Sequence, residues 1–284
     1  MLPVSEDKVY VDFFASHIKS YDSESFPIHF HEHIEIYFLV DGGKECLINN
    51  KVYEINAGDI LIFKPDQIHK IIRDDNKKFE RYIIEFSPRY LMDNFNPLEF
   101  RVIKNILNNN DVIIFSPTNE EKKKIIRLFS EYKKVNYQNP DPTFFHSTLR
   151  QIKFLELIAC IFAILQNHKN SKHKSSASNS LTSPVLDYLD KNFTTANLDT
   201  LAEHFNLSKS YLCTMFKKNT LMTINSYITS KKIIYAKNLL AEGKNVTETT
   251  ELCGFSDSTD FSRVFKKYTN TSPKKYQMSL KTWK

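Results

Sequence analysis

The sequence predicts an α+β protein in which an antiparallel β domain is followed by a helical hairpin and an all-α domain. Residues 26–90 alternate short apolar runs with turn residues, a pattern typical of a β meander that closes into a sandwich or small barrel. From Thr118 the apolar residues recur every three or four positions, which is the helical period. The last third of the chain contains two similar helical segments in succession.

Composition excludes several classes of protein. The 284 residues are 41% hydrophobic and 25% charged, which suits two globular domains. The five glycines leave no place for a Rossmann or P-loop phosphate loop, and the four cysteines form no C-x-x-C pair that would indicate zinc or a redox site. The longest apolar stretch, residues 154–165, contains Glu156 and is too short to span a bilayer. Because the start MLPVSEDK is not a secretory signal, we expect a cytoplasmic protein without a membrane partner.

Residues 1–115 are expected to form the β domain. Strands are predicted where apolar runs are bounded by Gly, Pro, Asn or Asp, at residues 34–40, 45–49, 52–55, 60–63, 69–72 and 79–86. Residues 1–20, which include Tyr10 and Phe13, are expected either to fold over the mouth of a barrel or to add an edge strand.

Residues 116–170 are expected to form the helical hairpin. Thr118 and Glu121 have the spacing of a capping box that starts a helix through about Tyr137, and the two prolines of residues 139–142 end it. The second helix carries an apolar stripe that packs either on the β domain or on a second copy of the chain. We predict a dimer contact through this stripe, whose residues are Phe145, Leu149, Ile152, Leu155, Ile158 and Phe162.

A polar segment at residues 171–182 is predicted to be a linker. It separates regions of different charge. Residues 1–171 have 22 basic and 24 acidic side chains, whereas residues 172–284 have 17 basic and nine acidic ones. The C-terminal domain, predicted at residues 183–284, is therefore expected to bind a polyanion, although a solvated basic face would show the same charge.

Self-comparison of the C-terminal domain shows a repeated unit. Residues 201–208 align with residues 249–256 at an offset of 48. Each unit has a helix, then a residue that can adopt positive φ (Asn206 or Gly254), then a serine that can cap a second helix (Ser208 or Ser256). This order is typical of a helix-turn-helix.

The second helix of each unit has one apolar face and one small, polar or basic face, as a helix that enters the major groove requires. Between the units, residues 224–241 are expected to form one helix about 27 Å long. A connector of this length can place two recognition helices about one DNA turn apart.

These residues resemble the AraC/XylS family of bacterial transcription regulators. The resemblance covers residues 183–280 and includes Leu201-Ala202-Glu203, Gly254-Phe255-Ser256-Asp257, Phe261-Ser262-Arg263 and Ser272-Pro273. It implies two helix-turn-helix units that read adjacent major-groove segments of double-stranded DNA. It also implies base contacts from Ser210, Cys213, Thr214, Ser258, Thr259, Ser262 and Arg263, and phosphate contacts from Lys209, Lys217, Lys218, Lys266 and Lys267.

The chain departs from the family pattern at several positions of this domain. Leu221 stands where glycine is usual, Thr249 and Thr250 replace an Ile-Ala pair, and Asp260 replaces an aromatic residue. A leucine adopts a left-handed turn only at a cost, and a carboxylate near DNA repels phosphate.

In the β domain, His29-x-His31-x-x-x-Glu35, followed by Gly58-Asp59, Pro65 and His69, resembles the two-part cupin motif of a small β-barrel. Positions 29, 31 and 35 lie on one face of an extended strand, and three imidazoles with a carboxylate suit Fe, Mn, Ni or Zn. A metal-dependent cupin enzyme, an oxygenase or isomerase with an accessory nucleic-acid-binding domain, is therefore the alternative function. The preferred interpretation is an effector pocket without metal, lined by His29, His31, Glu35, Tyr37, His69 and Arg81.

Together these features predict a ligand-responsive, sequence-specific transcription regulator of a carbohydrate-utilisation operon, with a cupin-like effector domain and no enzymatic activity. We expect a small-molecule effector, with a sugar favoured, and no cofactor. The expected partners are double-stranded DNA, a second copy of the chain and, if the regulator is an activator, RNA polymerase.

Overall fold

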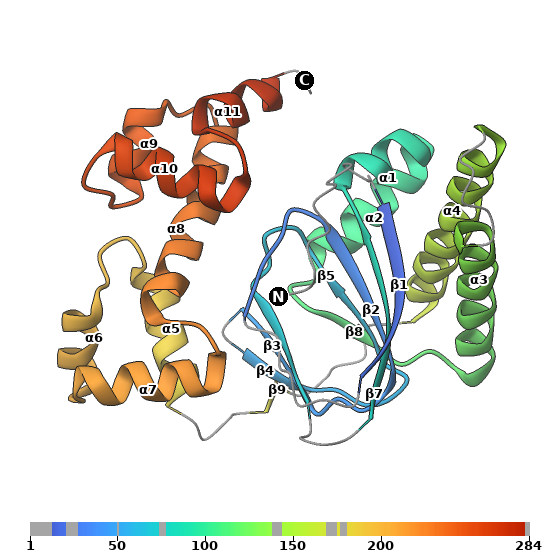
Figure 1. The fold of residues 1–284 in the computed structure, drawn as a ribbon, viewed down its shortest axis with the longest axis horizontal. Helices are drawn as coiled ribbons and strands as arrows, with labels where there is room; N and C mark the ends of the chain where they lie inside the picture. Colours follow the sequence, from blue (N-terminus) through green and yellow to red (C-terminus); the bar gives the residue numbers. More distant parts are fainter. Residues whose placement is uncertain are drawn as a thin grey trace. The chain divides into compact units, whose positions relative to one another are not determined.

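The computed structural model describes residues 13–20, 28–49, 51–73, 78–137, 144–168, 175–176 and 181–281. The chain divides into a mainly β unit within residues 1–176 and a mainly helical unit of residues 177–284, to which Ile28 and Asn49–Val52 are also assigned. This division falls inside the segment predicted to be a linker. The helical hairpin belongs to the same compact unit as the strands, and Figure 1 shows the elements of both units.

The β unit contains two antiparallel sheets. One has the strand order β1-β7-β2-β5-β8 and the other β6-β3-β4-β9. The strands are β1 (Phe13–Ser20), β2 (Ile34–Asp41), β3 (Glu45–Ile48), β4 (Lys51–Glu54), β5 (Ile60–Phe63), β6 (His69–Ile72), β7 (Phe79–Phe86), β8 (Ile113–Phe115) and β9 (Ser175–Ser176). The predicted strands are confirmed, and β1 pairs along its whole length with β7, so residues 13–20 add an edge strand. Tyr10 lies outside the described residues.

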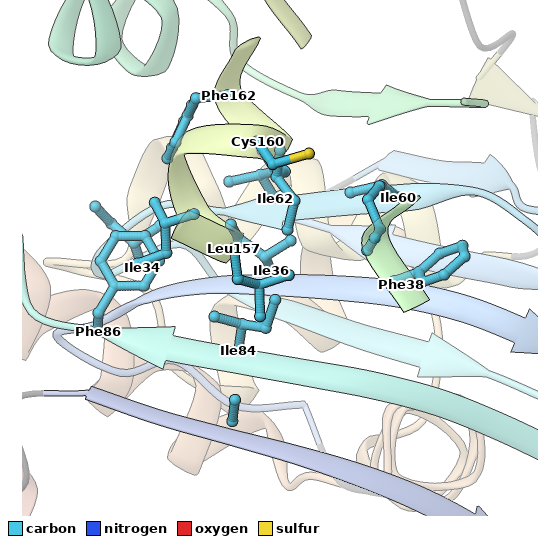
Figure 2. Packing of buried hydrophobic residues seen from close by; sticks show 14 of the residues in the cluster. Ile34, Ile36, Phe38, Ile60, Ile62, Ile84, Phe86, Leu157, Cys160 and Phe162 are labelled. Carbon is cyan, nitrogen blue, oxygen red and sulfur yellow. The ribbon is translucent and has the colours of Figure 1, made fainter. Parts of the chain in front are cut away.

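Alternation along β2 directs its side chains to two different cores. Ile34, Ile36 and Phe38 face the helices, where Leu157 packs on them (Figure 2). Tyr37 and Leu39 point between the sheets into a second cluster with Leu61, Phe63 and Phe79. The chemistry-bearing residues of β2 therefore lie on the interior side of the barrel.

Four helices cover the outer face of the five-stranded sheet. They are α1 (Pro88–Asn94), α2 (Pro97–Asn109), α3 (Asn119–Tyr137) and α4 (Phe144–Asn167). The capping box at Thr118 and Glu121 is confirmed, with N···O distances of 2.7 and 3.3 Å. Helices α1 and α2 were not predicted from the sequence, although Ser87 and Asn96 are N-caps followed by proline at the first turn. In the described part of the chain, no helix is both long and apolar enough to cross a membrane.

The apolar stripe of α4 divides into two parts. Ile158 and Phe162 are buried against the sheet and α3, so the prediction that they meet a second subunit is wrong. The reason is that the C-terminal half of α4 is apolar on most of its circumference and fills the core of the β unit. Leu149 and Ile152, in the N-terminal half, are 48% and 52% exposed. Leu155 is partly buried, and the side chain of Phe145 lies outside the described residues.

The helical unit consists of α5 (Thr182–Asn192), α6 (Leu198–Phe205), α7 (Lys209–Thr220), α8 (Ile224–Ala241), α9 (Val246–Leu252), α10 (Ser258–Thr269) and α11 (Pro273–Lys281). The connector helix α8 has the predicted bounds. Asn206 and Gly254 both have positive φ, of 50° and 67°, as the repeat predicts. Ser208 caps α7, but the cap of α10 is Asp257 rather than Ser256. The Asp257 carboxylate accepts from two backbone N–H groups, so it is the stronger acceptor.

The two threonines of α9 are compatible with a buried position. Thr249 and Thr250 are almost fully buried, and their hydroxyls donate to the carbonyl oxygens of Asn245 and Val246, each at 2.8 Å. Because each hydroxyl is bonded within its own helix, burial leaves no unpaired donor.

Leu221 ends α7 in the left-handed conformation, with φ 58° and ψ 15°. Asn270 occupies the equivalent position after α10 with φ 58° and ψ 5°. Because a left-handed residue other than Gly, Asn or Asp costs about 1 kcal/mol, Leu221→Asn is expected to raise the free energy of unfolding by that amount. Urea unfolding measures it, and Asn270→Leu is the reciprocal control, expected to lower stability. A loss of stability in Leu221→Asn would mean that the packing of the 39% exposed leucine outweighs the backbone cost.

Candidate nucleic-acid interface and effector site

The second helix of the first helix-turn-helix unit, α7, presents its predicted contact residues to solvent. Leu212 and Phe216 are fully buried, and because they lie on one side of the helix, the opposite side remains accessible. All six predicted residues are exposed: Lys209, Ser210, Cys213, Thr214, Lys217 and Lys218. The helix therefore offers an uncovered polar face with lysines at both ends.

The second helix of the second unit, α10, repeats this arrangement. Phe261 and Phe265 are fully buried in a core with Ile233 and Leu240 of α8. Of the predicted contact residues, Ser262 is half-buried, and Ser258, Thr259, Arg263, Lys266 and Lys267 are exposed. Both helices thus have the shape and charge that a major-groove contact requires.

Two exposed ion pairs involve the predicted contact residues. Lys209 pairs with Asp199 of α6. Arg263 Nη2 lies 2.5 Å from Asp260 Oδ1 one turn earlier on α10. The predicted base-contacting guanidinium is therefore already engaged by a carboxylate in the absence of DNA.

Removing the Asp260 charge is expected to strengthen DNA binding. Asp260→Asn frees Arg263 and removes a negative charge from a surface predicted to face phosphates, so we expect the Kd for duplex DNA to fall about 3- to 10-fold at low salt. Fluorescence anisotropy with a labelled duplex measures this change. Glu242→Gln, at the exposed end of α8, is the control matched in charge. Weaker binding by Asp260→Asn would show instead that the pair holds Arg263 in its binding position.

The β unit brings the predicted effector residues into one region of the barrel. Glu35, Tyr37, His69 and Arg81 are buried, and His31 is half-buried. Glu35 Oε2 lies 3.0 Å from both His31 Nε2 and His69 Nε2. His29 belongs to the same group, because its ring centroid is 4.3 Å from that of His69. The predicted His-His-Glu-His cluster is therefore present.

Burial and hydrogen bonding act in opposite directions on this cluster. Burial alone would raise the pKa of Glu35, but the hydrogen bonds with His31 and His69 hold that pKa well below its usual range. Burial alone would lower the pKa of His31, but the hydrogen bond and charge of Glu35 raise it above its ordinary value. The cluster thus stabilises a carboxylate inside the barrel.

A second group lies further along β2 and β7. The Arg81 guanidinium lies 4.7 Å from the ring centroid of Phe79 and 5.7 Å from that of Tyr37. Burial lowers the pKa of Arg81 and raises that of Tyr37. Arg73, whose guanidinium lies 4.9 Å from the Phe79 centroid, was missed because nothing in its local sequence indicates that it turns inward.

Glu85 is a further residue of the site that was not predicted from the sequence. It lies directly opposite Glu35 in the β2–β7 register, and burial raises its pKa, with the charge of Glu35 adding to the effect. Glu85 follows Ile83 and Arg81 by two and four residues, so the alternation of a strand places all three side chains on one face. This pattern could have identified Glu85 from the sequence.

In a different region, two cavities of about 520 and 270 Å³ lie between α2 and α4, and Val102, Ile106 and Gln166 line both.

Comparison with known proteins agrees with both halves of this description. Residues 14–101 match the AraC-like ligand binding domain, and residues 201–279 match a helix-turn-helix domain. An uncharacterized HTH-type transcriptional regulator in the cgkA 5' region of Pseudoalteromonas carrageenovora is 37% identical over 123 residues, which span 41% of this chain and 74% of that protein. The chain belongs to the AraC family of transcription regulators.

Longer matches cover both units of this AraC-family regulator. The melibiose operon regulatory protein of Escherichia coli strain K12 is 25% identical over 262 residues, which span 88% of this chain and 82% of that protein. The HTH-type transcriptional activator RhaS of Escherichia coli strain SE11 is 24% identical over 286 residues, 93% and 94% of the two chains. A crystal structure of ToxT from Vibrio cholerae O395 has a TM-score of 0.38 at 15% identity over 95% of this chain and 98% of that one.

The family settles the choice between the two functions predicted from the sequence. This AraC-family chain is a ligand-responsive transcription regulator with a helix-turn-helix DNA-binding domain, and the alternative of a metal-dependent enzyme is wrong, because its relatives are regulators. Nothing in these relatives points to a reaction cofactor, and the ligand-binding domain is the part that takes a small-molecule effector.

Proposed function

We propose that this regulator is a cytoplasmic protein that binds a sugar through its β unit. With the sugar bound, it activates a carbohydrate-utilisation operon by binding DNA upstream of the operon and contacting RNA polymerase. One relative supports the sugar, since it is named for a melibiose operon, and another supports activation, since it is named the transcriptional activator RhaS. The buried side chains of Tyr37 and Arg81 offer a hydroxyl and a guanidinium. These groups suit the hydroxyls of a sugar.

The observation that carries the DNA-binding part is the pair of exposed recognition faces on α7 and α10. In each helix the apolar side chains are buried while serine, threonine, lysine and arginine remain accessible. The predicted base contacts are Ser210, Cys213, Thr214, Ser258, Thr259, Ser262 and Arg263, and the lysines contact phosphates. We expect a site with two segments about 10 base pairs apart.

The experiment is a selection of random duplexes by the full chain, followed by anisotropy titrations at several salt concentrations. We expect one enriched two-segment sequence and a linear fall of log K with log salt, with a slope near −0.9 for each phosphate neutralised. A panel of mono- and disaccharides is then screened by thermal shift, and one sugar is expected to raise Tm. Salt-independent binding, or no enriched sequence, would contradict the DNA-binding part, whereas a panel without any shift would contradict the sugar.

The exposed start of α4 supports a dimer in this proposal. Leu149 and Ile152 are about half exposed and lie one turn apart, so a second copy of the chain would bury them with a gain of about 1 kcal/mol or more each. Replacing both by lysine is expected to give folded monomers that bind one half-site normally and a repeated site much more weakly. Light scattering and anisotropy measure both effects. Leu98→Lys, at a 60% exposed leucine of α2, is the matched control, and a double variant that remains dimeric would place the contact elsewhere.

A further inference from the structure

Four side chains of the β unit bring their ligating atoms together. His29, His31, Glu35 and His69 each offer one nitrogen or oxygen atom, and these atoms all lie within 4.8 Å of one another. Backbone hydrogen bonds of 3.1 and 3.0 Å join His29 and His69. The strand-like pairing therefore holds two of the imidazoles side by side.

The hydrogen bonds of two of these histidines determine which ring nitrogen faces the cluster. His31 Nδ1 lies 3.1 Å from the carbonyl oxygen of His33, and His69 Nδ1 lies 2.9 Å from that of Gln67. A carbonyl oxygen only accepts, so in each ring Nδ1 carries the hydrogen and donates it. In the neutral imidazole the lone pair is then on Nε2, and this is the arrangement that carbonyl groups impose on metal-ligating histidines.

Both Nε2 atoms face another acceptor. Each lies 3.0 Å from the same oxygen, Oε2 of Glu35. Two neutral imidazoles would direct their lone pairs at this carboxylate, which is repulsive, so the group needs a positive species: either a proton, which makes an imidazole a hydrogen-bond donor to Glu35, or a metal ion that replaces it. A metal ion fulfils this requirement for all the donors at once.

The residues next to the four side chains favour a bound cation and hold the ligands in place. Glu85 lies directly opposite Glu35 on the neighbouring strand, and two carboxylates in such a pair repel each other. The ring of His69 stacks on Phe63, with centroids 3.9 Å apart and planes 7° apart, so the imidazole cannot easily turn away. The sequence predicted an effector pocket without metal as the preferred role of these residues, with a metal cluster as the alternative, whereas the geometry of the four ligating atoms favours a ligand set.

We propose that His29, His31, Glu35 and His69 bind one divalent transition-metal ion inside the sensor barrel. Three nitrogens and one carboxylate oxygen suit Zn²⁺, Ni²⁺, Fe²⁺ or Mn²⁺, whereas Mg²⁺ and Ca²⁺ prefer sites built from oxygen. The ion is a ligand of the regulator and not a reaction cofactor. Because it links β2, β6 and the segment before β2, its binding stabilises the folded β unit.

The test uses the full chain after removal of metal with EDTA. The protein is equilibrated with Zn²⁺, Ni²⁺ or Mg²⁺, separated from free ion by gel filtration, and analysed by mass spectrometry of the elements. We expect one Zn²⁺ or Ni²⁺ for each chain, no Mg²⁺, and a higher Tm with the bound ions. His69→Ala and the isosteric Glu35→Gln are expected to bind at least about 100-fold more weakly. His17→Ala and His168→Ala, at histidines bonded to Glu80 and Glu121, should bind as the wild type does.

Three outcomes would overturn the proposal. They are a wild-type chain that retains neither Zn²⁺ nor Ni²⁺, ligand variants that bind as tightly as the wild type, and an equal loss in the His17 or His168 control. If His69→Ala does not fold, Glu35→Gln decides, because it changes one charged oxygen to an amide. DNA binding is measured on the same samples. A chain that binds metal but not DNA contradicts the regulator proposal alone, and a chain that binds DNA but not metal contradicts the metal site alone.

Discussion

Replacing Gly254 by alanine is expected to destabilise the helical unit by roughly 2 to 5 kcal/mol, from backbone strain and steric overlap together. Gly254 has a φ of 67°, and a Cβ atom there would collide with the backbone carbonyl oxygen of Thr194. Its own carbonyl accepts a hydrogen bond of 2.7 Å from Lys232 Nζ, so the turn cannot shift away without breaking that contact. Urea unfolding followed by circular dichroism measures the loss, and hydrogen exchange in α9 and α10 localises it.

Gly243 supplies the matched control for this substitution. It also has a positive φ, of 95°, but a Cβ atom there would meet nothing within 4 Å. Gly243→Ala therefore carries only the backbone cost of about 1 to 2 kcal/mol. If Gly254→Ala and Gly243→Ala lose equal stability, the close approach of residue 254 to Thr194 contributes nothing, and the turn is not tightly packed.

Removing two neighbouring lysines from α7 is expected to weaken DNA binding about 10- to 100-fold at moderate salt. Lys217 and Lys218 are exposed in the last turn of α7. If each neutralises one phosphate, the slope of log K against log salt becomes less steep by about 1.8 in the double alanine variant. Because phosphate contacts carry no sequence information, the preference among duplexes should remain unchanged. Anisotropy titrations at four or more salt concentrations measure both quantities.

The β unit offers a control with the same change of charge. Lys133 and Lys134 are adjacent, exposed lysines in α3, and their double alanine variant should bind DNA nearly as well as the wild type. A similar loss in both double variants would show that net charge alone, rather than the α7 surface, determines affinity. A change of sequence preference in the α7 variant would mean that one of these lysines contacts a base.

Much of the helical unit could be predicted from the sequence because its signals are local. Asn206 and Gly254 end helices where only a few residue types adopt positive φ easily. The bounds of α8 follow from the apolar period and the cap at Thr223. Leu221 shows the limit of such rules, because it ends α7 in the left-handed conformation despite the backbone cost.

The strands of the barrel were predictable for a similar reason, but their partners were not. Alternation identifies the residues of β2 and β7 that point inward. Which of them meet depends on the register between strands, and only the structure places Glu85 opposite Glu35. The same limit applies to Arg73, which reaches the ring of Phe79 from the end of another strand.

By itself, the sequence determined the order of most of the elements, the repeated helix-turn-helix and the presence of His29, His31, Glu35 and His69 in the barrel. These depend on residue types, on local apolar periodicity and on comparison of the chain with itself. Only the tertiary structure decided that Ile158 and Phe162 belong to the core while Leu149 and Ile152 remain exposed. It also decided which nitrogen of His31 and His69 faces Glu35. Burial depends on residues distant in the chain, and the contact between His69 and Glu35 spans 34 residues, so no local pattern records them.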